Sequence, residues 1–149
     1  MIIRGDRQSL EGKAAWILAE NIQDTLTRQR QVVLAVPGGR SVGGVFRCLA
    51  RENVDWERVH IFMVDERLVP QGHPDCNFSV VEENLQEIIA FTSMHPFIFT
   101  PSQEQSGVEN YRRELADLGG RFDIVLAGCG EDGHIASIFP WHHESESDT

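Results

Sequence analysis

Residues 128–134 (GCGEDGH) combine, in one short segment, the residue types that acid–base catalysis requires. A neutral imidazole can take a proton from water near pH 7, so His134 is a candidate general base. Asp132, two residues earlier, can orient that imidazole or line the same site. A helix-capping aspartate beside a structural histidine is the alternative, but glycines on both sides of an acid–base pair favour a catalytic role.

A second group of charged residues lies in residues 64–70 (VDERLVP), in a loop that continues to Asn77. Arg67 can bind an anionic substrate or stabilise an oxyanion, although a surface ion pair is the commoner fate of such an arginine. Asp65 and Glu66 are adjacent, and neighbouring side chains in an extended segment point in opposite directions. At most one of the two carboxylates is therefore expected to face a binding pocket.

Residues 37–41 (PGGRS) form a third candidate loop. The adjacent Gly38 and Gly39 allow the backbone to approach a ligand closely, and the N-terminus of a following helix attracts anions. Ser41 can bind a phosphate oxygen or cap that helix, and a simple Gly-Gly turn is the competing interpretation. No Gly-Lys-Ser/Thr follows, so this loop is not a Walker A motif.

The elements that must position these loops alternate between helix and strand. Amphipathic periodicity predicts four helices, at 8–29, 42–51, 78–90 (with Asn77 as N-cap) and 104–118. Continuous apolar runs predict three strands, at 31–36, 59–64 and 122–127, and a further short strand is expected at 97–99. Apolar strands separated by helices predict a three-layer α/β/α fold with a doubly wound, mostly parallel, Rossmann-like sheet. Ligands bind at the carboxyl ends of strands in such folds, where all three loops lie. Residues 135–139 are expected to form a helical turn that anchors the third loop in the core.

Composition narrows the functional classes. The chain has 149 residues, which suit a single domain over 1–149 with a flexible acidic tail at 142–149. Its net charge of −10 argues against binding to nucleic acids or anionic membranes. Three widely spaced cysteines and no apolar leader favour a cytoplasmic protein without disulfides, and no ligand spacing indicates a metal site.

Three motifs together resemble the 6-phosphogluconolactonase family: VPGGRSV at 36–42, VDERLVPQGHPDCNF at 64–78 and FDIVLAGCGEDGHIASIFP at 122–140. They occur in the family's order and at about its spacing. Glucosamine-6-phosphate deaminases share the fold and a similar third loop, but that loop ends in Phe-Asn-Glu-Pro, whose glutamate supports the catalytic histidine. Here Phe139 takes the place of that glutamate, and Arg67 stands where the deaminases usually carry an aromatic residue.

The resemblance implies hydrolysis of 6-phosphogluconolactone in the pentose phosphate pathway without a cofactor. His134 would activate water, Asp132 would orient it, Arg67 would stabilise the oxyanion, and the first loop would hold the phosphate. The implied substrate-binding residues are Gly38, Gly39, Arg40, Ser41, Asp65, Asn77, Gly130 and Gly133.

The alternatives are a deaminase or isomerase of the same superfamily and a non-catalytic sugar-phosphate-binding protein. Family members usually continue beyond the third motif. The resemblance therefore also implies a C-terminally shortened chain, in which a homodimer would cover an exposed sheet edge.

Overall fold

The computed structural model describes residues 2–39 and 41–140, and it confirms the α/β class. Four parallel strands form one sheet in the order β3-β2-β1-β4: β1 (Val32–Val36), β2 (Val59–Met63), β3 (Ser93–His95) and β4 (Ile124–Val125). In the central pair, Val32 is in register with Val59, and Val36 with Met63. The carboxyl ends of β1 and β2 therefore finish side by side, at the same edge of the sheet.

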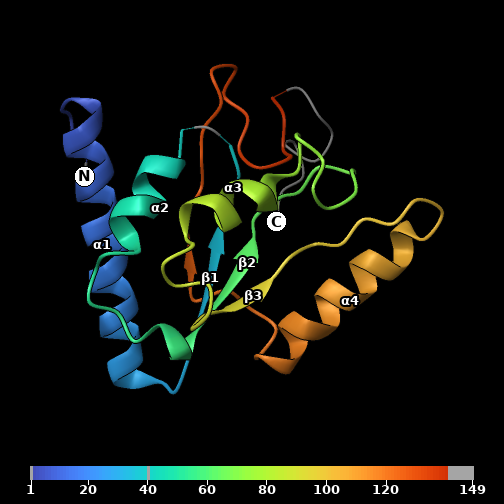
Figure 1. Ribbon diagram of the computed structural model, residues 1–149, viewed down its shortest axis with the longest axis horizontal. Helices are drawn as coiled ribbons and strands as arrows, with labels where there is room; N and C mark the ends of the chain where they lie inside the picture. Colours follow the sequence, from blue (N-terminus) through green and yellow to red (C-terminus); the bar gives the residue numbers. More distant parts are fainter. Residues whose placement is uncertain (1, 40, 141–149) are drawn as a thin grey trace.

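Helices cover both faces of this sheet, as predicted for a three-layer fold. Figure 1 shows α1 (Arg7–Arg28) and α4 (Glu104–Asp117) on opposite sides, with α2 (Gly43–Leu49) and α3 (Asn77–Asn84) on the side of α1. Alternate strand residues explain the layers, because successive side chains in a strand point to opposite faces. The main core joins α1, α2 and α3 to one set of strand side chains: Val32, Leu34, Val36, Val59, Ile61 and Met63.

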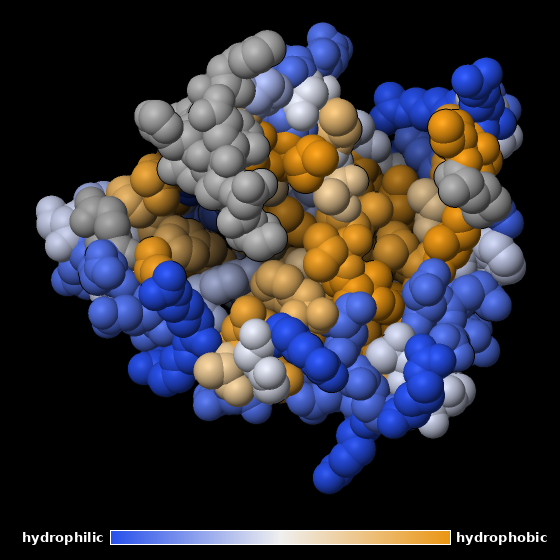
Figure 2. All heavy atoms as spheres, turned by 180° about the vertical axis from the view of Figure 1, so that it is seen from behind, coloured by the Kyte–Doolittle hydropathy of each residue, from blue (hydrophilic) through white to orange (hydrophobic). Residues whose placement is uncertain are grey.

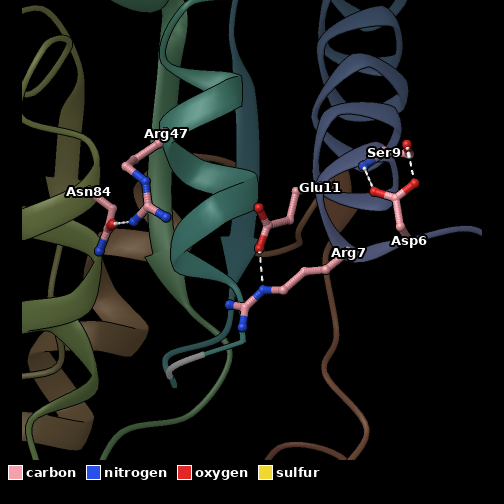
Figure 3. Close-up of polar contacts among 6 residues, drawn as sticks. All are labelled: Asp6, Arg7, Ser9, Glu11, Arg47 and Asn84. Atoms are coloured by element: carbon pink, nitrogen blue, oxygen red, sulfur yellow. Dashed lines mark hydrogen bonds and ion pairs between the residues drawn. The ribbon is translucent and has the colours of Figure 1, made fainter.

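Figure 3 shows polar contacts in the first layer, where Arg47 of α2 donates to the side-chain oxygen of Asn84 at the end of α3. Asp6 caps α1 by accepting the Ser9 backbone N–H at 3.0 Å, and these contacts with Ser9 lower the pKa of Asp6. Glu11 of α1 lies against Gly44 of α2, where an added Cβ would come well within 3.0 Å of the carboxylate. The helices therefore approach closely because position 44 has no side chain.

The opposite face packs on α4 through aromatic and polar side chains. Phe62 of β2 contacts Tyr111 edge to face, with ring centroids 5.2 Å apart. The Tyr111 hydroxyl donates to the Met63 carbonyl at 2.5 Å, and burial, followed by the charge of Glu114, raises the pKa of Tyr111. α4 is thus fixed to the last residue of β2, directly before the second candidate loop.

The predicted position of one strand and the predicted end of one helix are wrong. The strand expected at 97–99 lies at Ser93–His95 instead, since Pro96 has no N–H to donate and ends the pairing with β2. The helix expected over 78–90 ends at Asn84, and tighter turns follow. Leu85 and Ile88 are nevertheless buried, which is why the apolar period continues beyond the helix.

A chain of three titratable groups connects the sheet to α4. His60 Nδ1 lies 3.0 Å from His95 Nε2, and His95 Nδ1 lies 2.7 Å from a carboxylate oxygen of Glu114. The ring of Phe62 stacks on that of His95, with centroids 4.2 Å apart. Burial lowers the pKa of His60 below 6.5, and the charge of His95 lowers it further.

This arrangement predicts that the protein loses stability as the pH falls below about 7. His60 in the unfolded chain binds its proton at a higher pH than His60 in the folded protein, so acid favours the unfolded state. In His60→Gln, the free energy of unfolding should vary less between pH 7 and pH 5.5. Urea unfolding across this range measures the slope, and an unchanged slope in the variant would contradict the prediction.

Candidate active site

The three loops expected to carry chemistry line one pocket beyond the carboxyl ends of β1, β2 and β4. In Figure 1 the arrows of β1 and β2 point toward this end of the molecule, where the loops gather. Each loop contributes to the lining: Pro37, Gly38, Gly39 and Ser41 from the first, Asp65, Arg67 and Asn77 from the second, and Gly128, Cys129, Gly130, His134 and Ala136 from the third. The sequence motifs therefore meet in space, although up to about 100 residues separate them.

The third loop holds His134 and Asp132 as a hydrogen-bonded pair. His134 Nδ1 lies 2.5 Å from Asp132 Oδ1, and the His134 backbone N–H donates to the same oxygen at 3.3 Å. An ionised carboxylate can only accept hydrogen bonds, so Nδ1 carries the proton and a neutral ring has its lone pair on Nε2. Among the described residues Nε2 has no hydrogen-bond partner, which leaves it able to accept a proton from a bound water.

Hydrogen bonds from His134 also favour the ionised form of Asp132. The side-chain bond is the largest cause of the lowered Asp132 pKa, and the backbone N–H of His134 adds to it. Asp132 is therefore a carboxylate at neutral pH. It can hold the imidazole in one tautomer and orientation.

Gly130 is the glycine on which the placement of the imidazole depends. A Cβ at this position would lie well within 3.0 Å of two His134 ring atoms and 2.8 Å from Asp132 Oδ1. Gly130 also donates its N–H to the His134 carbonyl at 2.8 Å, closing the loop. Gly133 has φ +88°, a conformation that favours glycine, and so makes the turn between the two acid–base residues.

The second loop sends one of its two adjacent carboxylates to the pocket. Asp65 lines it, whereas Glu66 turns away and accepts hydrogen bonds from backbone N–H groups at the start of α3. Arg67 also lines the pocket, and it is absent from the ion pairs formed among residues 2–39 and 41–140. In the described part of the chain the guanidinium is thus not neutralised by a protein carboxylate.

Asn77 connects the second loop to the first. Its predicted role as an N-cap is wrong, because Cys76 occupies the cap position and Asn77 is the first residue of α3. Asn77 Nδ2 instead donates to the Asp65 carbonyl oxygen at 3.2 Å. On its other side, an added Cβ at Gly38 would come well within 3.0 Å of the Asn77 side chain.

The first loop presents Gly38, Gly39 and Ser41 to the pocket, and Arg40 lies outside the described residues. Gly39 has φ +99°, so its glycine makes a left-handed turn. The cap residue of α2 is Val42, which makes no side-chain hydrogen bond to the helix. Ser41 is therefore not the N-cap of α2, and its exposed hydroxyl is available for a ligand.

Replacement of Gly38 by alanine tests this packing. The added methyl group would force Asn77 away from Asp65, and we expect catalytic efficiency to fall by on the order of tenfold or more. Gly12→Ala is the matched control, because its Cβ would meet nothing within 4 Å on α1. Both variants are assayed on the substrate that the protein turns over. Equal activities would contradict the proposed packing of Asn77 against Gly38.

The segment after His134 differs from its prediction. Residues 135–139 do not form a helical turn in the core, since Ile135 forms antiparallel bridges with Cys129 and Ile138. Ile135, Ile138 and Phe139 are 49%, 51% and 44% exposed, and Val125 of β4 is 54% exposed. Seen from behind, apolar side chains cover a broad area of the surface (Figure 2). Apolar residue types alone did not reveal that this segment lies outside the core.

Four residues that had not been predicted as site residues also line the pocket: Pro37, Gly128, Cys129 and Ala136. The last three follow β4 within the motif, which is the only signal that could have indicated them.

No described helix is long and apolar enough to cross a membrane.

Comparison with known proteins places this geometry in context. Residues 5–149 match the family described as glucosamine-6-phosphate isomerases/6-phosphogluconolactonase. The 6-phosphogluconolactonase of Pseudomonas aeruginosa is 32% identical over 134 residues, which are 89% of this chain and 56% of the relative. That of Synechocystis is 31% identical over 144 residues, which are 91% of this chain and 60% of the relative.

A solved structure shows the same arrangement of the backbone. The 6-phosphogluconolactonase of Trypanosoma brucei superposes with a TM-score of 0.81 at 28% identity, covering 97% of this chain and 65% of its own. The chain thus spans a little over half the length of the curated relatives it matches. The family match over residues 5–149 includes the three loops, and the superposition covers nearly all of this chain.

Proposed function

Because this chain belongs to the glucosamine-6-phosphate isomerase/6-phosphogluconolactonase family, we propose that its pocket hydrolyses 6-phosphogluconolactone to 6-phosphogluconate. One observation carries the proposal. His134, which is held by Asp132, and Arg67, which forms no ion pair with a described carboxylate, line the same pocket from loops more than 60 residues apart in the chain. A general base and a cation around one small volume are what hydrolysis of an activated ester requires.

His134 would act as the general base. With the Nδ1 proton held by Asp132, Nε2 takes a proton from water as the water oxygen bonds to the lactone carbonyl carbon. The carbonyl electron pair moves to its oxygen and forms a tetrahedral oxyanion. When this collapses, the bond to the ring oxygen breaks, and the imidazolium returns its proton to that oxygen. The product is an open-chain acid that ionises.

Arg67 would stabilise the oxyanion, assisted by backbone N–H groups of the glycine loops. A charge-assisted hydrogen bond in a pocket is stronger than one between neutral groups, so a single guanidinium can contribute substantially to the rate. This assignment is supported by the position of Arg67 in the lining and by the absence of a described carboxylate partner. Asp65, in the same lining, would accept hydrogen bonds from sugar hydroxyl groups.

The loop at 37–41 would hold the phosphate of the substrate. Its support is the exposed Ser41 hydroxyl, the close backbone approach that Gly38 and Gly39 permit, and their shared position in the pocket lining. Arg40 would add positive charge. A net charge of −10 makes such local cations important, because the chain as a whole repels an anionic substrate.

Phe139 favours a lactonase over a deaminase. Its ring lies beside that of His134, with centroids 5.0 Å apart. The family resemblance puts a glutamate at this position in the deaminases, where it supports the catalytic histidine. An aromatic ring cannot accept or donate a proton, so this chain lacks the group at the position where deamination uses it.

Offering two substrates side by side tests the proposal. We expect the protein to accelerate the disappearance of freshly prepared 6-phosphogluconolactone, after subtraction of spontaneous hydrolysis, and to release no ammonia from glucosamine 6-phosphate. Ammonia release without lactone hydrolysis would favour the deaminase. Binding of 6-phosphogluconate without turnover of either substrate would favour a binding protein.

A further inference from the structure

The carboxylate of Glu66 joins the second loop to the first turn of α3. Oε1 accepts the backbone N–H of Arg67 at 2.7 Å and that of Asn77 at 2.6 Å, while Oε2 accepts the N–H of Phe78 at 2.8 Å. Cys76 Sγ lies 3.5 Å from the same Oε2 and donates to it. One side chain thus bridges residues that are up to 12 positions away in the sequence.

This bridge supplies what α3 lacks locally. The first N–H groups of a helix have no partner within the helix, and a Ser, Thr, Asp or Asn at the N-cap usually provides one. Cys76 occupies the N-cap of α3 and makes no such side-chain hydrogen bond. Glu66 takes over this function from another loop, and its negative charge suits the positive end of the helix.

The first residue of α3 transmits this contact to the pocket. Asn77 is 8% exposed, donates to the Asp65 carbonyl oxygen and packs against Gly38 of the first loop. Movement of the first turn of α3 would therefore displace pocket residues on two loops. Arg67 would move with them, because its backbone N–H is hydrogen-bonded to the Glu66 carboxylate.

We propose that Glu66 is a positioning residue, whose carboxylate holds the start of α3 against the second loop and thereby places Asp65, Arg67 and Asn77 around the substrate. The catalytic consequence rests on the proposed lactonase function, whereas the positioning of the loop and α3 by Glu66 does not. A helix cap alone would stabilise α3 without fixing the loop, and this difference can be measured.

The experiment compares Glu66→Gln with Glu83→Gln, which removes the same charge from an exposed position on α3. The glutamine amide has one oxygen where the carboxylate has two, and its NH₂ group repels a backbone N–H. At a temperature where circular dichroism shows both variants folded, we expect kcat/KM for 6-phosphogluconolactone to fall by on the order of 30-fold in Glu66→Gln, with a raised KM. Glu83→Gln should behave as wild type.

The double variant Glu66→Gln/Cys76→Ser separates positioning from capping. Serine at the N-cap can accept a helix N–H, so it should restore the thermal midpoint lost in Glu66→Gln, but it cannot reach the second loop. We expect KM to stay raised in the double variant, compared with Cys76→Ser alone. Recovery of both the midpoint and KM would overturn the proposal and leave Glu66 as a cap only, as would a wild-type KM in Glu66→Gln.

A readout without turnover keeps this test independent of the proposed function. The NMR signals of the Asn77 side-chain amide report its hydrogen bond to Asp65, and we expect them to shift in Glu66→Gln and to remain shifted in the double variant. If the wild-type protein does not hydrolyse the lactone, the proposed function fails, but these signals still test whether Glu66 positions the second loop and α3. Unchanged Asn77 signals would overturn that positioning role. Should Glu66→Gln fail to fold, the serine-capped double variant provides the same comparison.

Discussion

Replacement of His134 by alanine is expected to lower kcat for 6-phosphogluconolactone hydrolysis by a factor on the order of 10³, within the range typical of general-base catalysis. The imidazole is the only described group of the pocket placed to accept a proton from water while its other nitrogen is held by a carboxylate. Asp132 remains in the variant, but a carboxylate is a weaker base than an imidazole even without the His134 hydrogen bond that lowers the Asp132 pKa.

Initial rates at saturating lactone, corrected for spontaneous hydrolysis, measure this effect. His73→Ala is the matched control, because it removes an imidazole from the second loop that does not line the pocket. The control should retain wild-type kcat. If His134→Ala stays within about threefold of wild type, a different group must activate the water, and the general-base assignment is lost.

Replacement of Gly130 by alanine is expected to lower kcat/KM by on the order of 100-fold without unfolding the protein. The new methyl group would occupy the space of the His134 ring and approach Asp132, so the pair cannot keep its present geometry. A displacement of a reacting group by about 1 Å is enough for losses of this size. The loop lies at the surface, so the core that stabilises the fold is untouched.

Gly12→Ala provides the control, because it adds the same methyl group on α1, outside the pocket lining. A Cβ at Gly12 would meet nothing within 4 Å, and this glycine does not have a positive φ. Its activity should therefore stay close to wild type, with both unfolding midpoints similar. If Gly130→Ala were as active as Gly12→Ala, the specific packing against His134 would be refuted.

The convergence of the three loops could be predicted from sequence because it follows from topology. Buried parallel strands at 31–36, 59–64 and 122–127 must finish at one edge, and the glycine-rich and charged segments follow them directly. The observed strands β1, β2 and β4 lie within those ranges. The local sequence pattern was sufficient to predict this convergence, because each strand is indicated by its own run of apolar residues.

Details that depend on distant partners could not be predicted in the same way. Alternation predicted that at most one of Asp65 and Glu66 would face the pocket, but which one does so depends on the backbone N–H groups at the start of α3, which bind Glu66. Likewise, the residue type of Asn77 suits an N-cap, but its side chain donates to the Asp65 carbonyl oxygen instead of capping the helix. Residues 135–139 have core-like composition, yet tertiary packing leaves Ile135, Ile138 and Phe139 about half exposed.

The most direct test of the account is the rate constant for disappearance of freshly prepared 6-phosphogluconolactone as a function of protein concentration. For the chain of 149 residues we expect this rate constant to rise linearly above its spontaneous value, and the slope for His134→Ala to be lower by about three orders of magnitude. A slope of zero for the wild-type chain, or one that His134→Ala retains in full, would contradict the claim that these three loops form a lactonase site.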